Sequence, residues 1–132
     1  MIGRALISLA IFVFSGACVL GETATIYGDA EKTWYLVEID GEDFPTTATL
    51  TFPQPDRMSG EAPCNLYGAN LNALYPAFQP GPIMSTQRAC AFLAEEQAFF
   101  DALSTMTLAE VMGDTMTLSA PVGREMVFKA GD

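Results

Sequence analysis

The three cysteines of this 132-residue chain, Cys18, Cys64 and Cys90, are the residues with the widest chemical scope. The chain contains no histidine, which excludes Ser-His-Asp and Cys-His catalytic pairs, histidine-based zinc sites and HExxH helices. Cys64 and Cys90 form an even pair, and an oxidising compartment favours a disulfide between them. Closing a loop of about 26 residues in this way would stabilise the fold by roughly 3 to 4 kcal/mol.

A metal site and a catalytic thiol are the two alternatives for this pair. Two sulfur atoms without histidine are too few for a closed tetrahedral zinc site. Arg88 and the start of a helix near Cys90 would lower the pKa of a thiol there, but the chain offers no imidazole as a general base. We therefore expect a structural disulfide, and we predict no catalytic residue, no metal ligand and no cofactor.

Residues 1–17 have the pattern of a secretory signal peptide. Arg4 supplies a positive charge, residues 5–14 form a short apolar core, and residues 15–17 are small. Even extended to Leu20, the apolar run is shorter than the roughly 20 residues that span a bilayer. The segment therefore indicates export rather than a membrane span.

Cys18 follows this segment in a context that resembles the lipobox of bacterial lipoproteins, in which the cysteine thiol carries diacylglycerol. Ser15 occupies a position where that motif usually has leucine. The alternative is ordinary cleavage after Ala17, which would leave a free thiol at Cys18. We expect a lipid-anchored protein in a bacterial cell envelope, facing the periplasm, with a soluble periplasmic or secreted protein as the alternative. Residues 18–32 would form the lipidated N-terminus and tether, and residues 33–130 the folded domain.

Hydrophobic periodicity predicts an α+β fold in which a curved, mostly antiparallel, barrel-like sheet accompanies one amphipathic helix. The expected strands occupy residues 33–39, 47–52, 67–73, 115–119 and 125–129. Turns are expected at Asp40-Gly41 and at residues 121–123. The helix is expected over residues 92–106, with hydroxyls of Ser85 and Thr86 upstream as caps.

Eight side chains are expected in the core because they fall on the apolar faces of these elements: Trp34, Leu36, Leu50, Phe52, Tyr67, Phe99, Leu103 and Phe128. The side chain of Asn65 is expected to bind nearby backbone in a turn. The acidic residues of the helix, including Glu95 and Glu96, are expected on its opposite, polar side.

The order of several short motifs resembles the META domain family, which includes the bacterial HslJ-type proteins. The matching motifs are Trp34-x-Leu36-x-x-Ile39-x-Gly41, Leu50-Thr51-Phe52, Ser59-Gly60, Cys64-Asn65-x-Tyr67, Thr86-x-x-Ala89-Cys90 and Glu96-x-x-Phe99-x-x-x-Leu103, followed by Leu118 and Phe128. They cover residues 33–129. This sequence departs from the family pattern at Pro63 and Ala69, where glycine is usual.

The resemblance implies a small α+β domain of the envelope or of secreted proteins, frequently a lipoprotein. Some bacterial members are linked to heat shock and to novobiocin resistance, and no enzymatic activity is established for the family. The motif residues Trp34, Gly60, Asn65, Tyr67 and Thr86 are each explained by folding, as core, turn or cap. A signature of this kind favours a scaffold over a reaction centre.

The net charge of −10 opposes binding to nucleic acid. We therefore expect a non-enzymatic envelope lipoprotein with a META domain, which binds an envelope protein or ligand of unknown identity. The alternative is an acidic inhibitor or binder of a basic protein or peptide, whose encounter electrostatic steering would accelerate. A carboxylate enzyme ranks last: Glu95 and Glu96 point about 100° apart on a helix, and the acidic side chains within residues 40–43 lack the spacing of a calcium loop.

Overall fold

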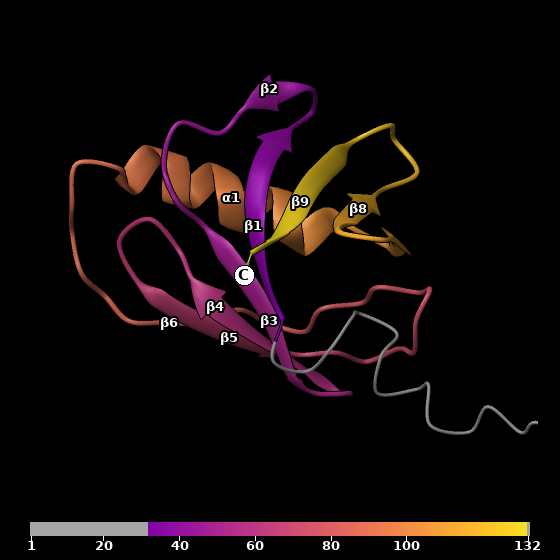
Figure 1. Ribbon diagram of the computed structural model, residues 1–132. Helices are drawn as coiled ribbons and strands as arrows, with labels where there is room; N and C mark the ends of the chain where they lie inside the picture. Colours follow the sequence, from indigo (N-terminus) through magenta and orange to yellow (C-terminus); the bar gives the residue numbers. More distant parts are fainter. Residues whose placement is uncertain (1–31, 132) are drawn as a thin grey trace, which may run out of the picture.

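The computed structural model describes residues 32–131, which form nine strands and one helix (Figure 1). The strands are β1 (Thr33–Ile39), β2 (Glu42–Asp43), β3 (Thr49–Gln54), β4 (Arg57–Glu61), β5 (Leu66–Asn70), β6 (Met84–Ser85), β7 (Leu108–Met112), β8 (Thr115–Ser119) and β9 (Glu125–Gly131). The helix α1 spans Leu93–Thr105, between β6 and β7. No helix in residues 32–131 is both long and apolar enough to cross a membrane.

The strands form one antiparallel sheet in the order β6-β5-β4-β3-β1-β9-β8-β7, and β2 pairs with β1. The predicted α+β class with a curved, mostly antiparallel sheet and one helix is confirmed. The sheet is not closed into a barrel, because its path ends at β6 and β7. The segment between β5 and β6 approaches β7 through a single bridge, Ala77 to Leu108.

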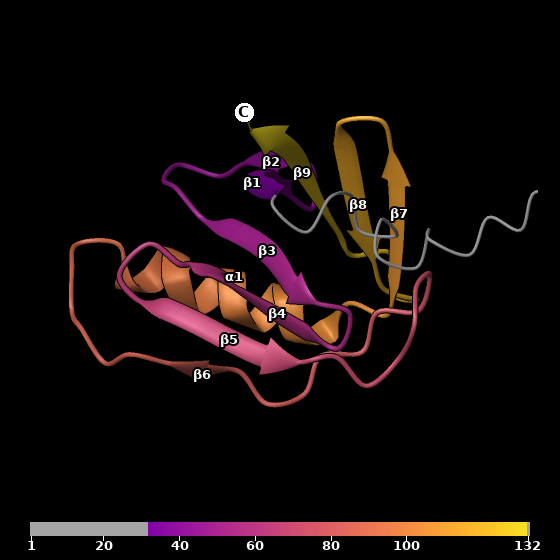
Figure 2. The same cartoon turned by 60° about the horizontal axis from the view of Figure 1, so that its bottom comes forward.

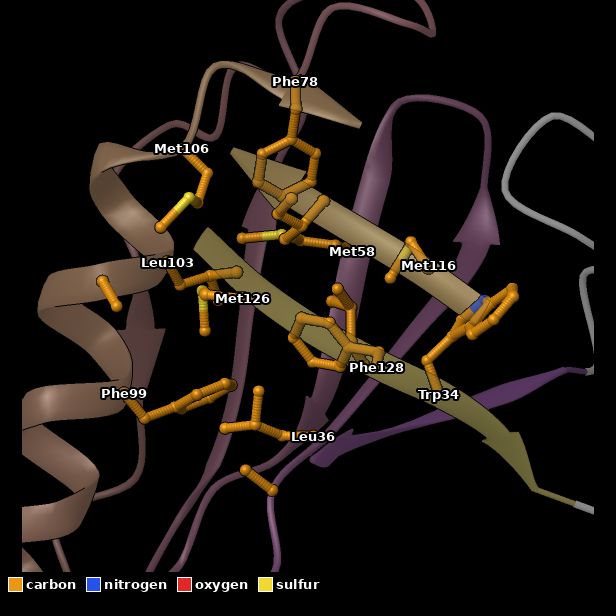
Figure 3. Packing of buried hydrophobic residues seen from close by; sticks show 14 of the residues in the cluster. Trp34, Leu36, Met58, Phe78, Phe99, Leu103, Met106, Met116, Met126 and Phe128 are labelled. Carbon is orange, nitrogen blue, oxygen red and sulfur yellow. The ribbon is translucent and has the colours of Figure 1, made fainter. Parts of the chain in front are cut away.

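The helix lies across the inner face of the curved sheet, and the core fills the space between them (Figures 1 and 2). All eight predicted core side chains are buried. Phe99 and Leu103 face the strands from the helix, Met106 does so from the residue after its end, and Trp34 lies at the far end of the core (Figure 3). Four fully buried methionines occupy the space around them: Met58, Met106, Met116 and Met126. Their flexible side chains suit the irregular gaps of a strongly curved sheet.

Both predicted hairpins are present. Asp40 and Gly41 have φ values of 52° and 82° in the turn between β1 and β2. Positive φ at both central residues is what a type I′ hairpin turn requires, and this turn matches the twist of the strands. β8 and β9 pair from Thr115 with Lys129 to Ser119 with Glu125. Local turn chemistry and alternation were therefore sufficient to predict these elements.

Candidate functional site

Asn65 lies at the centre of a polar cluster that joins three segments distant in the sequence. Its side-chain amide donates to the carbonyl oxygen of Arg88 at 3.0 Å and to Glu96 Oε2 at 2.7 Å. Its side-chain oxygen accepts from Thr86 Oγ1 at 2.8 Å and from the Arg88 amide at 2.6 Å. These four bonds use both donors and both acceptor positions of the side chain.

Glu96 is the charged partner in this cluster and is 5 % exposed. Its second oxygen, Oε1, accepts a hydrogen bond from the Cys64 amide at 3.0 Å. Glu96 also lies near the N-terminus of α1, where the helix dipole favours a negative charge. The carboxylate therefore connects the helix to the segment that precedes β5.

Two sequence-based expectations about this region are wrong. Thr86 does not cap the helix: α1 begins after Phe92, where no side-chain cap bond forms, and Thr86 Oγ1 instead accepts from the Leu66 amide at 3.1 Å. Ser85 lies in β6 and caps nothing at that helix end. The side chain of Asn65 does not bind nearby backbone in a turn. Its partners lie more than 20 positions away in the sequence, and the fold brings them next to it.

Glu96 is the residue of this cluster that the sequence pattern places on the solvent side of the helix, whereas the structure buries it. A signal was available in its spacing, since Glu96, Phe99, Leu103 and Met106 follow one another at intervals of three and four residues. These intervals place all four side chains on one helical face. The carboxylate is therefore buried with that face and needs the hydrogen bonds it receives.

A disulfide joins Cys64 to Cys90 beside this cluster, with their Cα atoms 5.6 Å apart. The expected pairing is thus present, and neither sulfur is available as a nucleophile or a metal ligand. Within residues 32–131, no group of three or more cysteine, aspartate or glutamate side chains has the arrangement of a metal site. Cys18 lies outside the described residues.

Tyr67, Gly60 and Thr49 form a second polar junction, between β5, β4 and β3. The ring of Tyr67 crosses over Gly60, and its hydroxyl donates to the carbonyl oxygen of Thr49 at 2.6 Å. An added Cβ at Gly60 would overlap the Thr49 carbonyl and lie 3.0 Å from Tyr67 Cε1. Burial raises the pKa of the Tyr67 hydroxyl. Glycine is therefore required at position 60 so that the Thr49 carbonyl and the Tyr67 ring can approach the backbone closely. Tyr67 is both a core side chain and a hydrogen-bond donor.

A groove of about 590 Å³ opens on the outer face of β1, β3 and β4, above this junction. We call it the hydroxyl groove; its lining includes Thr33, Tyr35, Thr47, Thr49, Ser59 and Glu61. The amide of Glu61 donates to Thr49 Oγ1 at 2.9 Å in place of a backbone ladder bond. The sequence predicts the strand at residues 47–52 but not the groove, because the groove is lined from several strands whose order in the sheet the sequence does not give.

A second hollow, the acidic cleft, has a volume of about 450 Å³ and lies between the β1–β2 hairpin and α1. Its charged lining consists of five acidic residues and one arginine: Asp40, Glu42, Asp43, Glu95, Asp101 and Arg124. The acidic turn between β1 and β2 is thus one wall of a cleft. Glu95 lines it, while Glu96 belongs to the Asn65 cluster, so the two carboxylates do not form a paired site.

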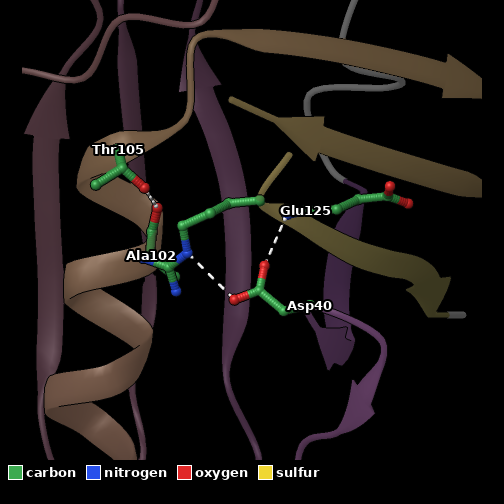
Figure 4. Close-up of polar contacts among 5 residues, drawn as sticks. Asp40, Ala102, Thr105 and Glu125 are labelled. Carbon is green, nitrogen blue, oxygen red and sulfur yellow. Dashed lines mark hydrogen bonds and ion pairs between the residues drawn. The ribbon is translucent and has the colours of Figure 1, made fainter. Parts of the chain in front are cut away.

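Asp40 has specific partners within this cleft (Figure 4). Its Oδ1 accepts from the Glu125 amide at 2.9 Å, and its Oδ2 accepts from Arg124 Nε at 3.2 Å. The hydrogen bond from Glu125, followed by the interaction with Arg124, holds the pKa of Asp40 below its usual value. This carboxylate fixes the end of the β8–β9 hairpin against the β1–β2 turn.

These arrangements define a small α+β domain in which a curved antiparallel sheet holds one helix through a disulfide and a buried polar cluster. The chain belongs to the META domain family, whose model matches residues 28–132. It is similar in fold to a protein from Burkholderia xenovorans solved by NMR, with a TM-score of 0.62 and 20 % identity over 98 % of this chain and 99 % of that one. A second NMR structure has a TM-score of 0.58 and 13 % identity over 76 % and 89 % of the two chains. No curated protein matches this chain.

Proposed function

We propose that this chain is a non-enzymatic cell-envelope lipoprotein whose META domain acts by binding. The observation that carries the proposal is the saturation of Asn65, whose four hydrogen bonds are all made within the domain. The neighbouring sulfur atoms are joined to each other. The residues of the family motif therefore hold the fold together. The surface of the domain is then the part that binds a partner or ligand.

The disulfide and the N-terminal sequence support the envelope location. A Cys64–Cys90 bridge is stable in an oxidising compartment such as the periplasm. Residues 1–17 have the pattern of a signal peptide, and Cys18 follows at the position of a lipidated cysteine. A lipid on Cys18 would anchor the domain through the intervening segment to a membrane surface.

Expression of the full chain in a bacterium tests this proposal. The expected product has lost residues 1–17, carries a lipid mass on Cys18, and partitions into detergent. The matched control is Cys18→Ala, which should lose both the lipid mass and the partitioning while retaining the Cys64–Cys90 bridge. A full-length cytosolic product with reduced thiols, or an exported product without lipid, would contradict the lipoprotein assignment.

The finer role that we propose, in envelope stress or drug resistance, follows from the family resemblance. Its test is growth of the native bacterium without this gene, at elevated temperature and with novobiocin. The wild-type gene should restore growth, and the Cys18→Ala gene should restore it less well. Unchanged growth of the deletion strain under both conditions would remove this role.

A second candidate function, as a binder of a basic protein or peptide, is favoured by the acidic cleft between the β1–β2 hairpin and α1. A cationic probe such as oligolysine should bind at low salt and dissociate as salt rises. Glu95→Gln with Asp101→Asn, two changes in the cleft, should weaken binding more than Asp56→Asn with Glu110→Gln, which change the net charge equally elsewhere. Equal effects of the two double variants would indicate a nonspecific charge effect.

A further inference from the structure

We infer that the hydroxyl groove is a binding site for a neutral oligosaccharide. The inference rests on the proposed binding function and names its surface and ligand class. The groove is the larger of the two hollows described above, and at about 590 Å³ it has the size of a site for a small ligand. Its chemistry distinguishes a sugar from the other classes of ligand.

The groove is nearly free of charge, although the chain carries a net charge of −10. Among the described residues that line it, only Glu61 is charged. A cationic ligand would be drawn to the acidic cleft, and an anionic ligand would be repelled by the chain as a whole. The hydroxyl groove is therefore suited to a neutral molecule.

The groove offers both a ring face and hydroxyl groups. Tyr35 is 44 % exposed, and its ring rests against Gly131, where an added Cβ would overlap the ring. One ring face is thus supported by backbone, and the amphipathic ring can present its other surface to a ligand. Around it, the hydroxyls of Thr33 and Thr47 and the carboxylate of Glu61 supply donors and acceptors. A pyranose ring, with C–H groups on its faces and hydroxyls at its rim, matches this combination.

The strands below the groove argue against a peptide as the ligand. β1, β3 and β4 are interior strands of the sheet, so an extended peptide finds no free strand edge to pair with there. A long acyl chain would require a continuous apolar wall, whereas threonine, serine and tyrosine hydroxyls line this groove. A neutral sugar needs neither a free strand edge nor a continuous apolar wall.

Titration of the exported protein with neutral tetrasaccharides tests the inference. The probes are the N-acetylated chitotetraose, cellotetraose and maltotetraose, and any detergent present must have no sugar headgroup. Saturable binding to at least one of them is expected, with amide NMR shifts confined to β1, β3, β4 and the adjacent residues. Failure of all three to bind, or shifts located at the acidic cleft, would overturn the inference.

Substitutions of Tyr35 make the test specific to the hydroxyl groove. Tyr35→Ala should weaken binding about tenfold, because it removes the ring that stacks on the sugar. Tyr35→Phe should retain affinity within about threefold, since it loses a single neutral hydrogen-bonding group. Phe92→Ala is the matched control: Phe92 is a similarly exposed aromatic residue outside the groove lining. Equal affinity of Tyr35→Ala and the wild type would contradict the proposed site.

A change beneath the ring supplies an independent check. Gly131→Ala would displace the Tyr35 ring from its support, and binding should weaken although the ring is still present. The state of Cys18 does not enter this experiment. A protein without lipid that binds the sugar would contradict the lipoprotein proposal alone, and a lipidated protein without sugar binding would contradict the groove alone.

Discussion

The side chain of Asn65 donates a hydrogen bond to the buried carboxylate of Glu96 at 2.7 Å, joining positions 31 residues apart. Replacement of Asn65 by alanine would leave Thr86, Arg88 and Glu96 without their shared partner. Loss of a hydrogen bond to a buried carboxylate strongly destabilises the folded state. Asn65→Ala should therefore lower the free energy of unfolding by about 3 kcal/mol. Urea denaturation of the disulfide-bonded protein measures this effect.

The control for that variant is Asn70→Ala. Asn70 is an exposed residue at the end of β5, and its substitution should change the free energy of unfolding by less than about 0.5 kcal/mol. Similar losses in the two variants would show that the Asn65 cluster does not hold α1 to the sheet.

Gly60→Ala tests the close approach of β3, β4 and Tyr67. The new Cβ would overlap the Thr49 carbonyl, and backbone atoms cannot yield as a flexible side chain does. We expect a loss of about 3 kcal/mol or more, at the upper end of overpacking effects. Gly68→Ala is the matched control in the adjacent strand, where the nearest atom would lie 3.4 Å away. Thermal unfolding of both variants gives the comparison, and equal stability would refute the steric argument.

The helix, five of the nine strands and eight core side chains could be predicted from the sequence because their signals are local. Leu50 and Phe52 alternate with threonines, and Phe99 and Leu103 follow helical spacing, so each burial is encoded within a few residues. The Asp40-Gly41 turn is likewise set by two adjacent residues that accept positive φ. These predictions required no knowledge of which strands are neighbours.

The candidate sites could be predicted only in part, because their partners are set by topology. Proximity in sequence predicts Thr86 as a cap of the helix, whereas the pairing of β5 with β6 places it against Asn65. Glu96 is expected on the polar side of the helix but is buried; its helical spacing indicates that burial, whereas its hydrogen-bond partners have no signal in the sequence. The hydroxyl groove is lined from several strands that the sheet order makes neighbours, and this order has no periodic signal in the sequence.

Removal of the disulfide should weaken the fold without abolishing it. Cys64→Ser with Cys90→Ser should lower the free energy of unfolding by about 3 to 4 kcal/mol, the loop-closure entropy expected for a separation of 26 residues. The wild-type protein under reducing conditions should show the same loss, which controls for the substituted side chains. Two reactive thiols in the native, unreduced protein would contradict the bridge itself.

The charge of Asp40 should stabilise the protein only above acidic pH. Because its folded pKa is lowered by the Glu125 amide and by Arg124, its contribution is present above the unfolded value of about 3.9. It is lost as the pH falls through the folded pKa. Asp40→Asn, which retains tolerance of positive φ, should be less stable than wild type at pH 7, and the difference should close in acid. Glu42→Gln serves as the control, and a constant difference at all pH values would contradict the assignment.

Tyr67 should make the fold sensitive to alkali. Its hydroxyl is buried and donates to the Thr49 carbonyl, and burial raises its folded pKa above the unfolded value of about 10. Above that unfolded value only the unfolded chain releases the proton, so stability falls as pH rises, by about 1.4 kcal/mol per pH unit for this group. Denaturation at pH 9 to 11.5 should show this slope developing above about pH 10 in the wild type but not in Tyr67→Phe. At neutral pH, Tyr67→Phe should lose about 1 to 2 kcal/mol through the unpaired carbonyl. Groups that are common to both proteins contribute equally to the two curves, so the difference between the curves isolates Tyr67. Parallel curves would mean that the hydroxyl reaches solvent and that the junction beneath the hydroxyl groove is open.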